Sequence, residues 1–375
     1  MPSSKTSEAE AGRRLLNFAL LSIITFSIMM SKLAMAQQQQ DVSPPQSRNH
    51  VFANKIFQVL TEGNSKNLIF SPLSLEIVLA AAGLGAIGET KNQISNGISL
   101  PLEKEFLKSR YAPLLTGIKD DSGCILRIAT QMFVESRFSL LEGFVKSSAE
   151  AFQCGLESVD FISNPESALQ TINSWAEERT QGLIKNLLQG DDIDDSTRLV
   201  LVNAVYFKGQ WAYQFDAAQT RKEDFHLLDG RTVQVDMMHI ERRFRFGRPN
   251  GLNAKVLELP YKGDQLSMVI LLPDSSSSIA ELEEKVSAEA FDLDDLLSNH
   301  TYPVEVTVSL PKFKLEVSTD LVEPLHKLGM TKMFSSEADF SGISVGEELK
   351  VSKVLQKAFI EVTEEGTEAA AATGM

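Results

Sequence analysis

One nine-residue stretch is apolar on both faces of an extended chain and restricts the fold more than any other segment. Residues 199–207 read LVLVNAVYF, so both sets of alternating side chains are apolar apart from Asn203. A strand of this kind must be covered on both faces, as is typical of the middle of a large sheet. A buried amide needs hydrogen-bond partners from neighbouring elements. We therefore expect a broad central sheet with polar contacts at Asn203.

The remaining patterns predict an α+β protein. Ser71-Pro72 is a typical helix opening, with serine as the cap and proline at the first helical position. Helices come mostly early in the chain, and the later strands do not alternate with helices as they would in a parallel α/β fold. Periodicity predicts helices at residues 52–60, 142–152 and 167–180, and strands at 126–134, 266–272, 304–310 and 358–363.

Composition excludes several classes of function. The chain has 375 residues and 43% apolar content, enough for one large domain or two medium ones. A net charge of −14 argues against nucleic acid or an anionic membrane as the main partner. The five histidines show no paired metal-ligand spacing. We therefore expect no metal and no cofactor.

The N-terminus has the pattern of a secretory signal peptide at residues 1–36. Arg13 and Arg14 precede an apolar run at residues 15–30, and Ala34-Met35-Ala36 is a small-x-small cleavage pattern. A membrane anchor is disfavoured because the run is short and Lys32 interrupts its end. Residues 37–50 form a polar linker. The chain is therefore expected to be secreted to the extracellular space.

Secretion would permit two covalent modifications. A single disulfide between Cys124 and Cys154 and two buried free thiols are both compatible with the sequence. Asn299-His300-Thr301 is a glycosylation sequon in a polar segment, which predicts a glycoprotein.

Two motifs resemble functional sites of other classes. Gly83–Gly88 fits GxGxxG, but the Ser71-Pro72 helix opening lies too close upstream for a dinucleotide-binding fold. Arg242, Arg243, Arg245 and Arg248 are interleaved with phenylalanines, a pattern that favours the solvated face of a strand over a heparin site.

The C-terminal segment is rich in small residues. The strand at residues 358–363 leads into Gly366, which is free to adopt hinge backbone angles, then Thr367 and the alanines at 369–372. Taken alone, the alanines fit either a helical or frayed terminus, or a segment small enough to enter between neighbouring strands.

Six segments, in order from about residue 51 to residue 375, resemble the serpin family. They are residues 67–74 (NLIFSPLS), 201–211 (LVNAVYFKGQW), 310–313 (LPKF), 328–334 (LGMTKMF), 338–342 (ADFSG) and the stretch from Glu364 to Ala372. Each motif is modest alone, but their common order is specific.

The resemblance implies both a fold and a mechanism. The fold has several helices packed around three β-sheets, one of them a large central sheet, in a domain spanning residues 51–375. The implied activity is suicide inhibition of serine or cysteine proteases: the protease attacks an exposed loop, and the cut loop inserts into the central sheet. Such a protein is not an enzyme, and we expect a monomer.

The resemblance also assigns roles to residues. The segment that enters the sheet is the hinge, Gly366, Thr367, Glu368, Ala369, Ala370, Ala371 and Ala372. Trp211, Lys312 and Glu364 match the insertion point at the top of the sheet, with Lys312 and Glu364 as an ion pair. Ser71, Ser74 and Asn203 match a hydrogen-bonded cluster under the strands that part, and the family's usual histidine partner falls at Gln356.

The end of the chain departs from the family pattern. Met375 falls a few residues before the expected scissile bond, so the family's C-terminal strands are expected to be missing. The sequence is then a fragment, ends at a splice junction, or is a non-inhibitory remnant. We interpret it as a secreted serine protease inhibitor whose scissile bond lies outside this sequence. The alternative is a non-inhibitory serpin-like binding, chaperone or decoy protein.

Overall fold

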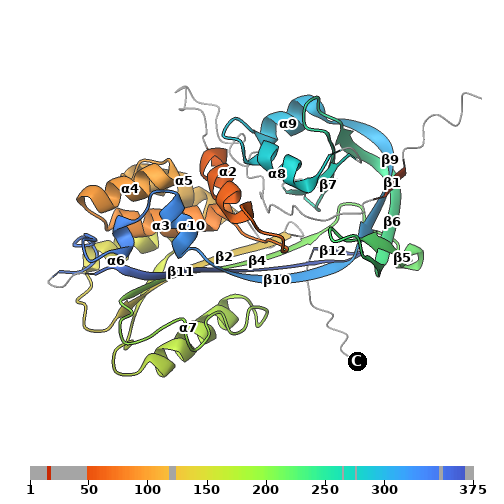
Figure 1. Ribbon diagram of the computed structural model, residues 1–375. Coiled ribbons are helices and arrows are strands. Elements are labelled where there is room, and N and C mark those ends of the chain that lie inside the picture. Colours follow the sequence, from red (N-terminus) through yellow and green to blue (C-terminus); the bar gives the residue numbers. More distant parts are fainter. Residues whose placement is uncertain are drawn as a thin grey trace, which may run out of the picture.

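The computed structural model describes residues 15–17, 49–117, 124–263, 266–274, 277–345 and 349–367. Most of the segment assigned to the signal peptide, residues 37–48 of the linker, and the hinge residues Glu368–Ala372 lie outside this part of the chain. The described residues form an α+β fold with two six-stranded sheets. One of them contains the apolar strand at residues 199–207 and is called the larger sheet, after the large central sheet that the resemblance implies. Figure 1 shows helices stacked on one face of this sheet and one helix beneath it.

The larger sheet contains the apolar strand predicted at its centre. The strand order is β10 (Phe313–Asp320), β11 (Val351–Val362), β12 (Gly366–Thr367), β4 (Leu199–Gln210), β2 (Cys124–Glu135) and β3 (Gly155–Val159). β4 is buried along almost its whole length, as its sequence predicts.

The contact between β4 and β11 changes along the sheet. The two strands pair in parallel from Val351 to Ala358 of β11. Towards the other end, the two-residue strand β12 lies between them and pairs with both. The seam between β4 and β11 is therefore closed at one end and occupied by β12 at the other.

The second sheet differs from the expectation of three separate sheets. Its strands follow the order β1 (Leu15–Asn17), β9 (Tyr302–Pro311), β6 (Thr232–Gly247), β7 (Ala254–Pro260) and β8 (Ser267–Pro273), with β5 (Arg221–His226) paired to β6. The described strands form two sheets because β6 and β9 are long and pair continuously from Met237 to Phe246, which joins β5 to β7 through one curved sheet.

β1 lies within the segment assigned to the signal peptide and pairs in parallel with residues 307–309 of β9. Cleavage after residue 36 would remove β1 from this sheet.

The helices form two layers around the larger sheet (Figure 1). On one face lie α2 (Asn49–Thr61), α3 (Pro72–Leu84), α4 (Gly88–Ile98), α5 (Lys104–Gly117), α6 (Glu142–Phe152) and α10 (Val322–Lys327). On the opposite face lies α7 (Pro165–Arg179), whereas α8 (Ile279–Ser287) and α9 (Leu293–His300) lie beside β7. Two short 3₁₀ turns, η2 (Ala217–Gln219) and η3 (Lys332–Phe334), complete the described elements.

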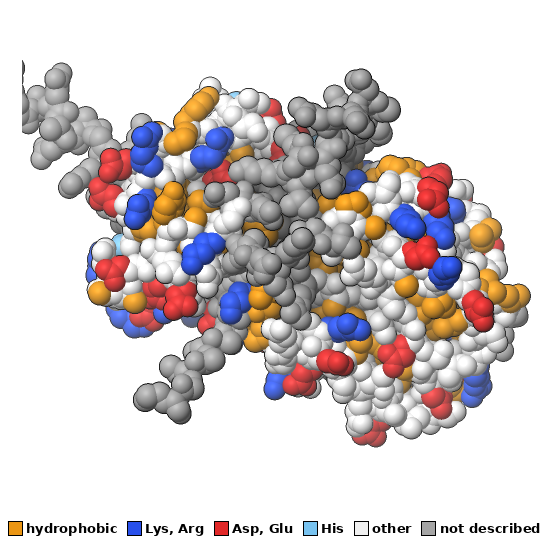
Figure 2. All heavy atoms as spheres, turned by 180° about the vertical axis from the view of Figure 1, so that it is seen from behind, with side chains coloured by type: hydrophobic (Ala, Val, Ile, Leu, Met, Phe, Trp, Pro, Cys, Tyr) orange, Lys and Arg blue, Asp and Glu red, His pale blue; other side chains and the backbone are white. Residues whose placement is uncertain are grey.

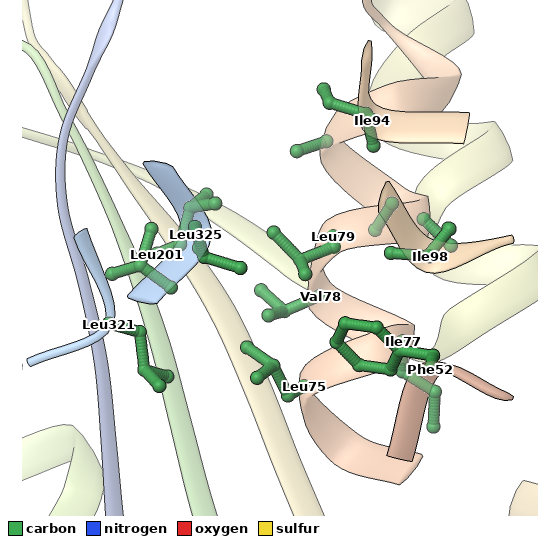
Figure 3. Close-up of a cluster of buried hydrophobic side chains, with 14 of the residues drawn as sticks. Phe52, Leu75, Ile77, Val78, Leu79, Ile94, Ile98, Leu201, Leu321 and Leu325 are labelled. Carbon is green, nitrogen blue, oxygen red and sulfur yellow. The ribbon is translucent and has the colours of Figure 1, made fainter. Parts of the chain in front are cut away.

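Helix α3 is at the centre of the helical layer. It opens as predicted, with the Ser71 side chain accepting a hydrogen bond from the Ser74 N–H and Pro72 in the first turn. Its sequence is apolar apart from Ser74 and Glu76, and the helix is buried on nearly every side. Figure 3 shows Val78 and Leu79 directed towards Leu201 of β4, and Ile77 beside Phe52 of α2. This packing ties α3 to the strand that carries Asn203.

The glycine motif belongs to helix ends and not to a nucleotide-binding turn. Gly83 is buried within the last turn of α3, and Gly88 begins α4 with a φ of +55°. The preceding residues are helical where a dinucleotide-binding fold has a strand.

Both cysteines are free and buried. Burial raises the pKa of Cys124 to about 11 and that of Cys154 to about 12, so both are protonated at neutral pH.

In the described part of the chain, no group of histidine, cysteine and carboxylate residues is arranged to hold a metal ion. No helix there has the length and apolarity needed to cross a bilayer.

Candidate functional site

Glu364 is held at the top of the larger sheet by an ion pair and by hydrogen bonds. Lys312, between β9 and β10, places its Nζ 2.8 Å from Glu364 Oε2. The Thr220 hydroxyl donates to Glu364 Oε1 at 2.8 Å, and the Phe215 N–H donates to the Glu364 carbonyl at 3.0 Å. The predicted ion pair is therefore present, and Thr220 adds a contact that the sequence did not predict.

The charge state of Glu364 follows from these partners. Burial by itself would raise the pKa of the carboxyl, because the charged form is poorly solvated. The hydrogen bonds from Lys312, Thr220 and the backbone, and the Lys312 charge, outweigh burial and hold the Glu364 pKa below its ordinary value. Glu364 is therefore ionised at neutral pH.

Trp211 fixes the turn that follows β11. Its backbone N–H donates to the Glu365 carbonyl at 3.0 Å, and its indole Nε1 donates to the Thr363 carbonyl at 2.9 Å. The Thr363 N–H donates to the Gly366 carbonyl at 2.8 Å and closes the turn. The indole is 1% exposed and stacks on Tyr261 with ring centroids 4.7 Å apart. Trp211 therefore positions the residues on both sides of Glu364.

The first two hinge residues lie between β4 and β11. Gly366 is opposite Gln210, and a Cβ at this position would lie 2.0 Å from the Gly209 carbonyl oxygen. Only glycine fits so close to the β4 backbone. Thr367 is fully buried, and its hydroxyl lies 2.7 Å from the Tyr261 hydroxyl. Gly366 and Thr367 thus lie within the sheet, paired with β4 on one side and β11 on the other.

The predicted polar cluster lies where β4 and β11 are still paired. Gln356 is directly opposite Asn203, and its Nε2 donates to Asn203 Oδ1 at 2.9 Å, to Ser74 Oγ at 3.1 Å and to the Ser71 carbonyl at 3.1 Å. Its Oε1 accepts a hydrogen bond from the Ser71 N–H at 2.7 Å. An amide supplies both donors and an acceptor, so Gln356 completes the cluster without a histidine.

Asn203 extends this cluster to a third strand. Its Oδ1 accepts a hydrogen bond from Ser74 Oγ at 2.6 Å, and its Nδ2 donates to the Ser74 carbonyl and to Thr130 Oγ1 on β2. Asn203 is 1% exposed. The cluster therefore connects β11, β4, β2 and the start of α3, and separation of β4 from β11 would break it.

On the opposite face, Lys357 ties β11 to the connection between α7 and β4. Its Nζ donates to the Lys185 carbonyl at 2.6 Å and lies 2.7 Å from Glu316 Oε1 on β10. Parting of β4 from β11 must therefore also move this connection or release Lys357.

Three contributors were missed by sequence analysis: Thr130, Thr220 and Tyr261. Thr130 could have been identified from the sequence, because it lies in a predicted strand that could pair with the strand of Asn203. Thr220 and Tyr261 lie next to strand ends whose positions depend on the tertiary fold, and no local pattern marks them.

The arginine-rich strand and the predicted glycosylation site lie at or near the surface. Arg242 lies over the Tyr213 ring, Arg243 donates to the Pro303 carbonyl, Arg245 pairs with Glu258, and Arg248 pairs with Asp274. Each guanidinium therefore has a partner within the protein. On the described part of the face in Figure 2, acidic and basic side chains are interspersed. Asn299 is exposed at the end of α9 and donates to Asp295 Oδ1.

Substitution Lys312→Met is expected to lower the free energy of unfolding by at most about 1 kcal/mol at neutral pH, since Lys312 is partly exposed. A carboxyl with a depressed pKa stabilises the fold above its unfolded pKa, and this stability is lost as pH falls through the folded pKa. The difference between the two proteins should therefore shrink below about pH 4.5.

Urea unfolding at a series of pH values measures this difference. Lys314→Met is the matched control, because Lys314 is more exposed and lies 3.9 Å from its carboxylate partner. Equal effects of the two substitutions at neutral pH would contradict a specific role for Lys312.

Comparison with known proteins finds related chains and related structures. The family model described as "Serpin (serine protease inhibitor)" matches residues 47–375. The leukocyte elastase inhibitor of Bos taurus is 42% identical over 337 residues, which is 87% of each chain. Serpin48 of the insect Tenebrio molitor is 34% identical with a TM-score of 0.79, covering 88% of each chain. Human thyroxine-binding globulin, solved as a ligand complex, is 29% identical with a TM-score of 0.78, covering 87% of each chain.

A family model that spans most of the chain, a relative at 42% identity and solved structures with the same fold lead to one assignment. This chain belongs to the serpin family of serine protease inhibitors and is not an enzyme.

Proposed function

We propose that this protein inhibits a serine protease by inserting its own hinge as an additional strand of the larger sheet. The observation that carries the proposal is the position of Gly366 and Thr367, which pair with β4 on one side while β11 lies on the other. Insertion would continue along the same seam. Each further residue would replace a contact between β4 and β11 with two new strand contacts.

The hinge composition supports continued insertion. Thr367 already occupies a buried position, and residues of the same parity, Ala369 and Ala371, would follow it to the same face. Small side chains enter a packed sheet with little clash, whereas a charge would have to leave water. Glu368 has the other parity and would therefore face the opposite side of the sheet. The composition of the hinge is therefore compatible with its insertion as a strand of the larger sheet.

The trap would use the chemistry of the protease itself. A serine protease attacks the exposed loop and forms an acyl-enzyme through its own serine. If the cut loop enters the seam before water hydrolyses the ester, the protease is carried along and remains attached.

An elastase-like serine protease is the first target to test. The proposal rests on the name of the bovine relative, a leukocyte elastase inhibitor. Cysteine proteases are a second class, since they form an analogous thioester.

The decisive experiment uses the full-length protein as its source makes it. Incubation with elastase, chymotrypsin and trypsin should give, with at least one of them, a covalent complex that survives SDS and boiling. Complete cleavage without any complex would contradict the proposal. It would favour the non-inhibitory binding, chaperone or decoy function, which the similarity to thyroxine-binding globulin supports.

We further propose that the protein is a secreted, monomeric glycoprotein that works without a cofactor. The signal-peptide pattern and the exposed Asn299 support this. Intact mass and N-terminal sequencing of material from the culture medium test it. The expected N-terminus is Gln37, and the expected mass includes one glycan that is lost on Asn299→Gln. Retention of residues 1–36 in the mature protein would contradict secretion by this route.

A further inference from the structure

A row of three polar side chains crosses the second sheet outside the site described above. Ser309 on β9 is directly opposite His239 on β6, with Oγ 3.1 Å from His239 Nδ1. The other ring nitrogen, Nε2, lies 3.2 Å from Glu223 Oε1 on β5. Glu223, His239 and Ser309 therefore connect three strands through one imidazole, and we call them the polar row.

The partners define the form of the imidazole at neutral pH. An ionised carboxylate only accepts hydrogen bonds, so the proton belongs on Nε2, which faces Glu223. Nδ1 then accepts a hydrogen bond from the Ser309 hydroxyl. The His239 side chain is 11% exposed. A neutral ring thus accepts the Ser309 hydrogen bond in a largely buried position, whereas Nε2 lies near Glu223 without the alignment of a hydrogen bond.

The polar row lies next to the two groups that hold the Glu364 side chain. In register, Glu223 is opposite Val235, so its side chain reaches His239 diagonally, past the strand partners Arg221, Met237 and Pro311. Thr220, which bonds Glu364, immediately precedes Arg221, and Lys312, which pairs with Glu364, immediately follows Pro311. The backbone N–H of Lys312 also donates to the Asp236 carbonyl of β6. A shift of β5 or β9 relative to β6 would therefore displace a partner of Glu364.

We propose that the polar row positions Thr220 and Lys312 around Glu364, and that protonation of His239 loosens the row, so that docking of the hinge weakens in acid. His239 is a positioning residue in this inference and not a catalytic one. The consequence for protease inhibition rests on the proposed function, but the change in hinge docking does not.

Three features of the contacts favour loosening over tightening. Protonated Nδ1 carries a hydrogen, so the Ser309 hydroxyl must rotate from donor to acceptor. Glu223 Oε1 already lies 2.7 Å from Arg221 Nε, so a second cation gains less attraction there and meets the Arg221 charge. The ring is also largely removed from water, which disfavours its charged form.

The expected pH window follows from the same neighbours. Burial, which is the largest influence, lowers the His239 pKa; Glu223 raises it and Arg221 lowers it, with a net decrease. As pH falls, His239 in a separated polar row would bind a proton at the ordinary histidine pKa near 6.5. In the intact row, His239 would bind it only at lower pH. The row is therefore intact at neutral pH and weakens as pH falls through this range. On the same face of β6, Glu241 is exposed, and the facing β9 residues Thr307, Ser309 and Pro311 carry no charge.

Trp211 is the probe for hinge docking, because it stacks on Tyr261, which contacts Thr367. The chain has two tryptophans, so Trp175→Phe leaves Trp211 as the only one. In this background, Trp211 emission is followed from about pH 8 to about pH 5, with far-UV circular dichroism recorded in parallel. We expect an emission change with its midpoint below that of an exposed histidine and no change in secondary structure.

Variants assign the transition to the polar row. His239→Gln should abolish the emission change, because glutamine can contact Ser309 but does not titrate. Glu223→Gln should move the midpoint to lower pH by about 0.5 to 1 unit, since a carboxylate that favours the charged ring is lost. His226→Gln is the matched control, because His226 lies on β5 with Glu223 but is exposed and contacts Thr232; it should leave the transition unchanged.

The inference is overturned if His239→Gln keeps the transition, if His226→Gln removes it, or if emission changes only together with loss of secondary structure. None of these measurements requires a protease. A failure of the polar row is therefore distinguishable from a failure of the proposed inhibitory function.

Discussion

Substitution of Thr367 by arginine is expected to convert the full-length protein from an inhibitor into a substrate of its target protease. Thr367 is fully buried between β4 and β11, and its hydroxyl lies 2.7 Å from that of Tyr261. An arginine there must bring an unpaired charge into the sheet or stay outside it. Either outcome slows insertion, while loop cleavage and acyl-enzyme hydrolysis continue.

The expected size of this effect follows from a partition between two competing steps. If burial of the guanidinium adds only about 1.4 kcal/mol to the insertion barrier, the ratio of trapped to released protease falls tenfold. Effective penalties for unpaired buried charges are several kcal/mol, so an increase of at least about tenfold in the stoichiometry of inhibition is expected. Titration of residual protease activity against inhibitor concentration measures it.

Glu365→Arg is the matched control for Thr367→Arg. Glu365 lies two residues earlier in the same turn, its side chain is exposed, and its backbone carbonyl makes the contacts to Trp211 and Gln214. This substitution changes the local charge more than Thr367→Arg does, yet nothing has to enter the sheet. A similar loss of inhibition in both variants would mean that charge near the loop, and not insertion, controls the outcome.

Gly366 and Tyr261 show which parts of the site could be predicted from the sequence and which could not. The hinge was predicted from the resemblance, because the small residues alone also fit a helical or frayed terminus; parity then places Thr367 and Ala369 on one face. The partner of the Thr367 hydroxyl was not recognisable. Tyr261 lies 106 residues away and meets Thr367 only because Trp211 and Tyr261 pair across the junction of the two sheets.

The number of sheets and the polar row could not be predicted from the sequence for a related reason. The segments of β6 and β9 were visible as strands or as an arginine-rich face, but their continuous pairing depends on register, which one sequence does not specify. His239 and Ser309 come from strands far apart in the chain, and Glu223 reaches the ring from a third strand. Only tertiary pairing makes these residues a unit.

Asn203→Ala is expected to destabilise the native state by about 2 to 4 kcal/mol and to make the seam between β4 and β11 easier to open. The substitution removes one of two acceptors of Ser74 Oγ and one acceptor of Gln356 Nε2, and it removes the amide that donates to Thr130 Oγ1. Loss of buried hydrogen bonds and a small cavity account for the expected size. Because Gln356 keeps its contacts to Ser71 and Ser74, the variant should still fold.

Two measurements separate general destabilisation from seam opening in Asn203→Ala. Urea unfolding gives the loss of stability, and the uptake of a synthetic peptide with the hinge sequence GTEAAAA reports how readily the seam accepts a strand.

Asn173→Ala is the control, because Asn173 on α7 makes two hydrogen bonds to the Leu188 backbone, away from the seam. Both variants should lose stability, but only Asn203→Ala should take up the peptide faster than the unsubstituted protein. Equal uptake by the two variants would mean that the cluster stabilises the fold without holding β4 to β11, and that the barrier to insertion lies elsewhere, such as in the contact of Lys357 with the connection from α7 to β4.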